Sequence, residues 1–271
     1  LDYLFIGGMG MGPAGAALGT TLSQTLSVVV ALAVITRQKT GLPLGRASFK
    51  PRRDILGPIL KVGVPVALQD GFIQVSFILI TIIANNRGLN DAAAVGIVEK
   101  VISFVFLVPS SMLSTVSALA AQNAGAGKDQ RAAQTLRYAV TLCVGFGLAV
   151  GIAVQFLAGN IVAVFDSTPA VVEAGSQYIR GYIWDCMFAG VHFSFSGYFC
   201  AYGRSGISFL HNALSIVLVR IPGAYFMSRL FPATLLPMGC AAAAGSCLSV
   251  IVCVTAFVWL RRQGKLAGAA A

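Results

Sequence analysis

The chain has 271 residues, of which 57% are hydrophobic and only 10% are charged. A soluble domain is about 25% charged, so this composition excludes a disordered chain, a collagen or a coiled coil and argues against an ordinary soluble enzyme. The charge is unbalanced, with 19 Lys and Arg against 9 Asp and Glu and a net charge of +10. In so apolar a chain, the positions of the basic residues are more informative than their number.

Apolar stretches long enough to cross a membrane recur along the whole chain. A membrane helix needs about 20 mostly apolar residues, and residues 1–12 look like the end of one such span. The predicted complete spans cover residues 13–36, 62–86, 93–120, 138–165, 177–202, 207–230 and 236–260. The sequence therefore predicts an all-α, polytopic membrane bundle of about seven helices.

Basic residues concentrate in alternate loops between these spans. Residues 37–61 hold seven, residues 121–137 hold three, residues 203–206 hold one and the tail from residue 261 holds three. The loops on the other side hold little beyond Arg87. Because cytoplasmic loops are enriched in Lys and Arg, we expect the basic loops and the C-terminus to be cytoplasmic. This topology explains the positive charge without a nucleic-acid partner.

The basic segment 37–61 also predicts a boundary, because it is long for a loop inside one compact bundle. Its last residues, 52–61, suit either a short helix on the membrane surface or a plain linker. The small residues of 15–23 are echoed six spans later at 239–247, which favours two parallel six-helix halves. We therefore expect residues 1–36 to end an N-terminal bundle, 37–61 to link the bundles, and 62–271 to form a C-terminal six-helix bundle.

Two nucleotide-binding patterns in the chain are accidental matches. Residues 10–15 match G-x-G-x-x-G, but an apolar span follows where the fingerprint needs an acidic residue, and residues 125–128 lack two required positions of a P-loop. The six Cys form no C-x-x-C pair, and His192 and His211 have no partner at ligand spacing. We expect no metal site, no bound cofactor and no catalytic nucleophile.

Three acidic residues fall inside predicted spans, where an ionisable side chain is costly unless it faces a cavity or a partner. Asp70 shares a helix face with Gln74, Thr81 and Asn85, which suits either the wall of an aqueous cavity or a hydrogen-bonded seam between helices. Glu99 begins a stripe of serines, so it either lines a cavity as well or neutralises a basic residue on another helix.

Asp185 shares a helix face with Tyr182 and His192 and lies among many aromatic residues. A carboxylate among aromatic rings suits an organic cation or a site that exchanges a proton. The alternative is a structural ion pair with Arg220. Counted along their helices, Glu99, Asp185 and Arg220 lie at similar depths, about 10–15 Å below the outer surface.

Several segments resemble the multidrug and toxic compound extrusion (MATE) family. The resemblance rests on residues 13–18, 63–69, 93–97, 106–109 and 220–222, and above all on the loop Gln-Asn-Ala-Gly-Ala-Gly at 122–127. It implies two six-helix bundles around a cleft, with this chain supplying the last helix of the first bundle and the whole second bundle. Asp185 matches the acidic residue on the fourth helix of the second bundle, whereas Asp70 lies about one turn away from the one on the first helix.

The resemblance implies an antiporter of the bacterial inner membrane that exports drug-like or organic-cation substrates by alternating access, in exchange for H⁺ or Na⁺. Its partners are the small-molecule substrate, the lipid bilayer and a missing N-terminal six-helix bundle. Candidate substrate- or ion-binding residues are Asp70, Gln74, Glu99, Tyr182, Asp185 and His192. The alternatives are a flippase for lipid-linked precursors, which needs a strongly basic cavity, and a membrane-embedded enzyme.

Overall fold

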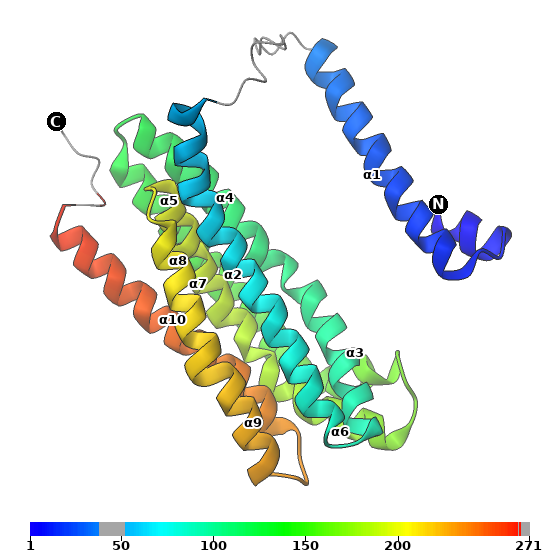
Figure 1. The fold of residues 1–271 in the computed structure, drawn as a ribbon. Helices are drawn as coiled ribbons and strands as arrows, with labels where there is room; N and C mark the ends of the chain where they lie inside the picture. The colour runs from blue at the N-terminus through cyan, green and yellow to red at the C-terminus, as the bar shows by residue number, and fades with distance from the viewer. Residues whose placement is uncertain (38–51, 265, 267–271) are drawn as a thin grey trace. The chain divides into compact units, whose positions relative to one another are not determined.

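The computed structural model describes residues 1–37, 52–264 and 266, and these residues form helices joined by turns, with no strand among them (Figure 1). The chain divides into two units, Leu1–Arg53 and Asp54–Ala271. Six helical stretches in the described part are long and apolar enough to cross a membrane. The predicted all-α, polytopic helical architecture is confirmed, although the predicted span 177–202 is not among these six stretches of the described residues.

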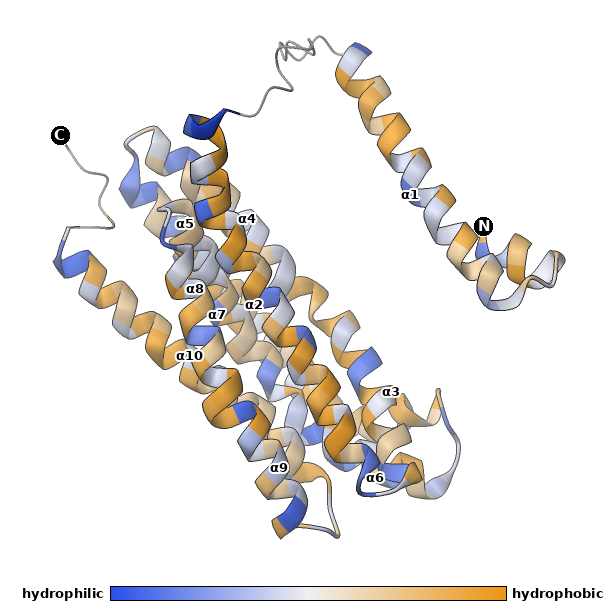
Figure 2. Cartoon of the chain, viewed as in Figure 1, coloured by the Kyte–Doolittle hydropathy of each residue, from blue (hydrophilic) through white to orange (hydrophobic). Residues whose placement is uncertain are grey.

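The first unit consists of a short π-helix, η1 (Tyr3–Gly8), and the helix α1 (Gly12–Arg37). The turn between them uses Gly10 at a φ of 64°, a conformation that a side chain would strain. Apolar residues follow α1 along much of its length (Figure 2), and side chains such as Leu26 are exposed. An apolar helix of 26 residues is long enough to span a bilayer.

The second unit is a bundle of helices that pass back and forth beside one another (Figure 1). Its elements are α2 (Arg53–Asn85), α3 (Leu89–Val105), α4 (Leu107–Gly125), α5 (Asp129–Ala163), α6 (Pro169–Tyr182), α7 (Trp184–Ala201), α8 (Ser205–Ser215), η3 (Ile216–Arg220), α9 (Ile221–Leu230) and α10 (Leu236–Arg262). The spans predicted between residues 62 and 260 all fall on these helices. Some spans comprise several elements, because the helix is interrupted at Phe106, at Ile183 and by the π-helix η3.

The helix α2 begins earlier than the sequence predicted. Residues 38–51 of the expected linker lie outside the described residues, and residues 53–61 are the first turns of α2 rather than a separate surface helix. Pro65 inside α2 has no N–H to bond the carbonyl of Lys61. Ser205 Oγ donates a hydrogen bond to that carbonyl instead, over 3.1 Å. A neighbouring side chain thus replaces the missing backbone bond, which is why a proline is tolerated within a membrane helix.

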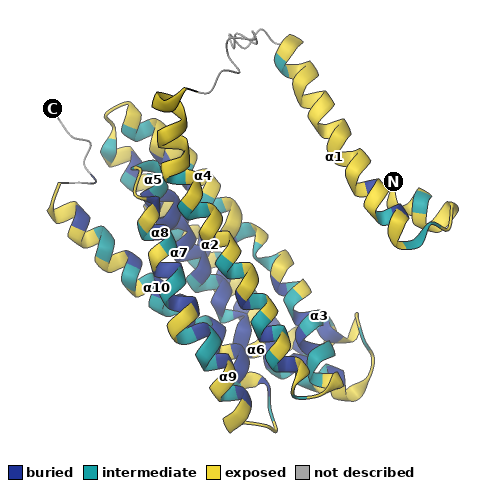
Figure 3. Ribbon diagram, in the orientation of Figure 1, coloured by how far each residue is buried: buried dark blue, intermediate teal, exposed yellow. Residues whose placement is uncertain are grey.

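The helix α7 lies in the interior of the bundle, and most of its residues are buried (Figure 3). Close packing around it depends on glycine. A Cβ on Gly197 would lie 2.4 Å from the carbonyl oxygen of Leu113 in α4, and one on Gly190 would lie 2.5 Å from Cys143 Cβ in α5. Small residues permit the close packing that holds membrane helices together. The polar side chains of α7 therefore have fixed neighbours.

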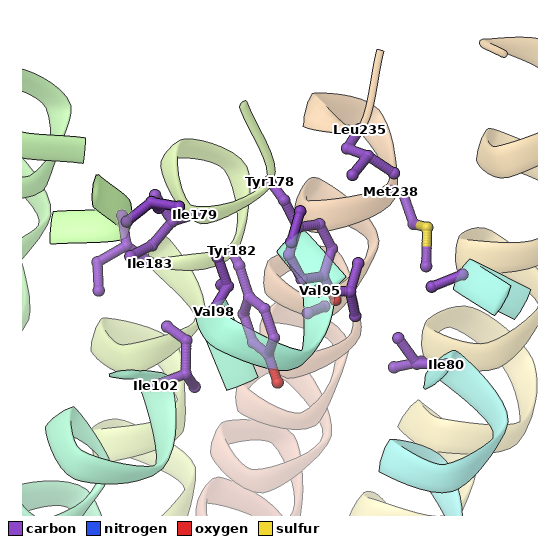
Figure 4. Close-up of a cluster of buried hydrophobic side chains, with 14 of the residues drawn as sticks. Ile80, Val95, Val98, Ile102, Tyr178, Ile179, Tyr182, Ile183, Leu235 and Met238 are labelled. Atoms are coloured by element: carbon purple, nitrogen blue, oxygen red, sulfur yellow. The ribbon is translucent and has the colours of Figure 1, made fainter. Parts of the chain in front are cut away.

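A cluster of buried apolar side chains packs α2, α3, α6 and α10 together near Tyr178 and Tyr182 (Figure 4). The rings of these two tyrosines meet edge to face, with centroids 5.5 Å apart. Both side chains are almost fully buried. The cluster forms one wall of the polar centre, because the Tyr182 hydroxyl is hydrogen-bonded to Arg220.

Candidate functional site

The polar centre of the second unit is built on Asp185, in the first turn of α7. Its side chain is fully buried, and Arg220 Nη2 lies 3.4 Å from its Oδ2. The same guanidinium donates a hydrogen bond to the Tyr182 hydroxyl. Neither Asp185 oxygen has a well-aligned hydrogen bond among the described residues, although the Ser246 hydroxyl of α10 lies next to the carboxylate. The ion pair that the sequence offered as one alternative is present, yet the carboxylate keeps unused hydrogen-bonding capacity.

An unusual stretch of backbone places Arg220. It ends the π-helix η3, where the Ile221 N–H bonds the carbonyl of Ile216, five residues earlier. Such wide turns are rare and are frequently found at functional sites. Gly245 of α10 allows close approach, because a Cβ there would lie 3.2 Å from Arg220 Cβ. Together these features hold the arginine in the bundle interior, where it is only 8% exposed.

An aromatic ring and a second carboxylate lie near the Arg220 guanidinium. Its Cζ is 5.4 Å from the ring centroid of Phe77, a distance typical of a cation–π contact. Glu99 Oε2 forms a hydrogen bond with Thr81 Oγ1 over 3.3 Å, whereas its Oε1 has no partner in the described part of the chain. Glu99 lies close enough for its charge to act on Arg220. Glu99, Asp185 and Arg220, which the sequence placed at similar depths, thus share one electrostatic environment.

A small cavity of about 40 Å³ lies beside this centre. Apolar side chains line one part of it, and the polar residues that line the rest are His192, Asn212, Ser215, Arg220, Ser246 and Ser249. Three of their nitrogen atoms are buried without a partner among the residues that the structure describes: His192 Nδ1, Asn212 Nδ2 and Arg220 Nε. Unpaired buried polar atoms are rare in proteins and indicate a water molecule or an ion.

The polar face of α8, which is centred on His211, was not predicted from the sequence. This histidine is buried, with Nε2 at 2.8 Å from Ser196 Oγ and Nδ1 at 3.3 Å from Ser249 Oγ. Its ring lies 5.4 Å from the ring of His192. The polar residues at 208, 211, 212 and 215 recur with helical spacing. That spacing could have revealed the face.

Asp70 and Gln74 stand apart from this centre. Both are exposed, and Asp70 lines an open groove together with Ser114 and Ser117 of α4. Thr81, which contacts Glu99, lies eleven residues further along α2, and that distance corresponds to about 16 Å of helix. The structure therefore does not bring Asp70 together with the buried acidic residues.

Comparison with known proteins shows that this sequence is similar to one protein family. The sequence profile of the MatE family matches residues 65–226. The chain is 27% identical to the probable multidrug resistance protein YpnP of Bacillus subtilis over 222 residues, which are 82% of this chain and 49% of that protein. It is 24% identical to the multidrug export protein MepA of Staphylococcus aureus over 235 residues, 86% of this chain and 51% of that protein. The chain thus spans about half the length of these curated relatives.

The fold also matches a solved transporter. The structure of the Vibrio cholerae MATE transporter VcmN superposes with a TM-score of 0.84, covering 98% of this chain and 60% of that one. Sequence identity over that match is 18%, so the likeness concerns the fold. The helices that surround Asp185 and Arg220 are therefore arranged as in a known transporter bundle.

Proposed function

The chain belongs to the MatE family of multidrug efflux transporters, and on this premise we propose that it forms part of a cation-coupled antiporter. The antiporter exports drug-like or organic-cation substrates in exchange for H⁺ or Na⁺ and alternates between states open to either side of the membrane. The observation that carries the proposal is Asp185. It is a fully buried carboxylate whose counter-ion Arg220 lies 3.4 Å away, with the Ser246 hydroxyl as its other polar neighbour.

The buried pair is suited to coupling because its two members depend on each other. Removing one partner of a buried ion pair leaves an uncompensated charge, at a cost of about 3–5 kcal/mol. A proton or Na⁺ that binds Asp185 competes with Arg220 for the carboxylate. It therefore favours a conformation in which Arg220 has other partners, and this differential affinity is what allows an ion to shift a two-state equilibrium.

We assign the exposed groove beside Asp70 to the substrate. Its volume of about 580 Å³ lies within the range of about 300–1,000 Å³ that is typical of sites for drug-sized molecules. Apolar side chains, among them Val62, Val66 and Leu113, line it together with the Asp70 carboxylate. An organic cation can pair its charge with Asp70 and lay its apolar part along α2 and α4, while Gln74 lies one turn away.

The proposal places residues 1–36 at the end of an N-terminal six-helix bundle, 37–61 in a cytoplasmic link, and 62–271 in the C-terminal bundle. Relatives about twice as long as the matched region support the presence of an N-terminal bundle in the whole protein. We assign the protein to the bacterial inner membrane, with the basic loops and the C-terminus in the cytoplasm, because positive residues concentrate on that side.

The test is efflux by the full-length transporter in bacteria that lack their own drug exporters. Cells expressing it should expel ethidium, and Asp185→Asn should abolish this efflux. Glu173→Gln is the matched control, because Glu173 is exposed and bonded only to Gln177 among described residues. Ethidium efflux by the Asp185→Asn variant at the normal rate, with equal protein in the membrane, would refute the assignment. Translocation of a lipid-linked precursor without ethidium efflux would favour the flippase.

A further inference from the structure

The small cavity beside the ion pair contains buried polar atoms that the described part of the protein does not satisfy. These atoms are Arg220 Nε from η3, Asn212 Nδ2 from α8 and His192 Nδ1 from α7. None of them has a hydrogen-bond partner among the described residues. A cavity needs roughly 10–15 Å³ to admit one water molecule, which must find two to four polar partners. At about 40 Å³, this cavity meets both conditions.

The same cavity lies between two titratable residues of α7, Asp185 and His192. Ser246 of α10 lines it and also lies next to the Asp185 carboxylate. His192 lines it from seven residues further along α7, about 10 Å at the rise of a helix. That offset is too long for direct proton transfer, so a path between the two residues needs groups in between.

The charges around His192 can be named for each element that packs there. On its own helix lies Asp185, η3 supplies Arg220 and α8 supplies His211. The helix α4 has no charged residue, and α5 supplies the Cys143 thiol, which packs against Gly190. Glu99 of α3 acts on this group through Arg220. The residues of α10 and α2 that line the cavity are uncharged. Both nitrogens of His211 face serine hydroxyls, whereas His192 Nδ1 is unpartnered among the described residues. His192 is therefore the imidazole that is available to the cavity.

We propose that this cavity holds water, and that the water, together with Ser246, passes the coupling proton between His192 and Asp185. In the forward step the His192 imidazolium gives its proton to the water. The water passes a proton to the Ser246 hydroxyl, and that hydroxyl passes its own proton to the Asp185 carboxylate. A positive imidazolium and a negative carboxylate become a neutral imidazole and a carboxylic acid, so charge and protons balance. The neutral acid no longer holds Arg220, which links the proton to the conformation.

This inference rests on the proposed function and selects the proton as its coupling ion. The first test compares two buried serines in the full-length transporter reconstituted into proteoliposomes. Ser246→Ala removes the hydroxyl that lines the cavity, whereas Ser194→Ala removes one that donates to the carbonyl of Gly190 in the same helix. Proton flux driven by an ethidium gradient should fall by about tenfold or more in the first variant and stay unchanged in the second. Ser246→Thr, which keeps a hydroxyl, should restore the flux.

The second test is the pH profile of the same flux in His192→Gln. Glutamine keeps a hydrogen-bonding group but cannot carry a proton. We expect the proton flux of the wild type to increase at acidic pH and that of His192→Gln to show no such increase, while the affinity for ethidium stays the same. An experimental map of the transporter should also show ordered water near Arg220 Nε and Asn212 Nδ2.

The outcomes separate the two proposals. Wild-type coupling that survives unchanged in both Ser246→Ala and His192→Gln overturns the relay but leaves the antiporter standing. A dry cavity also overturns the relay. Ethidium transport coupled to Na⁺ alone overturns the relay and retains the antiporter, whereas a wild-type protein without coupled transport overturns both. If Ser246→Ala does not fold, the His192→Gln profile decides.

Discussion

Breaking the Asp185–Arg220 pair should destabilise the transporter far more than replacing both members. The pair is buried on both sides, with side-chain exposures of 9% for Arg220 and 0% for Asp185. Arg220→Met leaves Asp185 without its counter-ion, and loss of one partner of a buried pair costs about 3–5 kcal/mol. The double variant Asp185→Leu with Arg220→Met removes both charges, and such replacements are often neutral or stabilising.

The assay is thermal unfolding of the purified full-length transporter in detergent. For a domain of this size, 1 kcal/mol shifts the melting temperature by roughly 2–4 °C, so Arg220→Met should lower it by about 6–20 °C. The double variant should recover most of that loss while remaining inactive in transport. Tyr182→Phe, which removes the hydroxyl that Arg220 bonds, should cost less than Arg220→Met, about 1.5–3 kcal/mol. Equal destabilisation by the single and double variants would refute the view that the two charges compensate each other.

Three further predictions concern the framework of the bundle. Ser205→Ala should lower the free energy of unfolding by about 1 kcal/mol, because it leaves the Lys61 carbonyl unsatisfied. In a Pro65→Ala background, where the backbone N–H is restored, the same substitution should have almost no effect. Additive losses in the double variant would contradict this. Arg87→Ala removes a side chain that donates hydrogen bonds to four carbonyl groups of residues 228–234 and forms an ion pair with Asp91. It should lower the free energy of unfolding by about 1.5–3 kcal/mol. An unchanged melting temperature would show that these contacts are dispensable. Gly197→Val should lower the yield of folded protein, because even a Cβ would lie 2.4 Å from a carbonyl oxygen of α4; normal expression and melting would contradict the packing described.

The positions of the spans were predictable because a bilayer imposes a length of about 20 apolar residues that no other environment requires. The start of α2 was not. The basic residues of 52–61 suited a surface helix or a plain linker, and the bond that compensates for Pro65 comes from Ser205, about 140 residues away. No local pattern contains that information.

The candidate site was predictable where charge was scarce. Acidic residues in membrane spans are few, so Asp185 could be identified by its residue type and position. Arg220 could be identified as its partner because the two residues lie at similar depths. The cavity was not predictable, since its polar lining comes from α7, α8, η3 and α10 at once. The π-helix that places Arg220 has no sequence signature beyond the following Pro222. Asp70 was grouped with the buried acids on residue type, but its position along α2 leaves it exposed.

The measurement that tests the central claim most directly is gradient-driven transport by the full-length protein in sealed proteoliposomes. A H⁺ or Na⁺ gradient imposed in the absence of ATP should drive ethidium against its own concentration gradient. Asp185→Asn should bind ethidium and allow no uphill movement, because the residue that exchanges the coupling ion is gone. Uphill transport by Asp185→Asn under the same gradient would contradict the account.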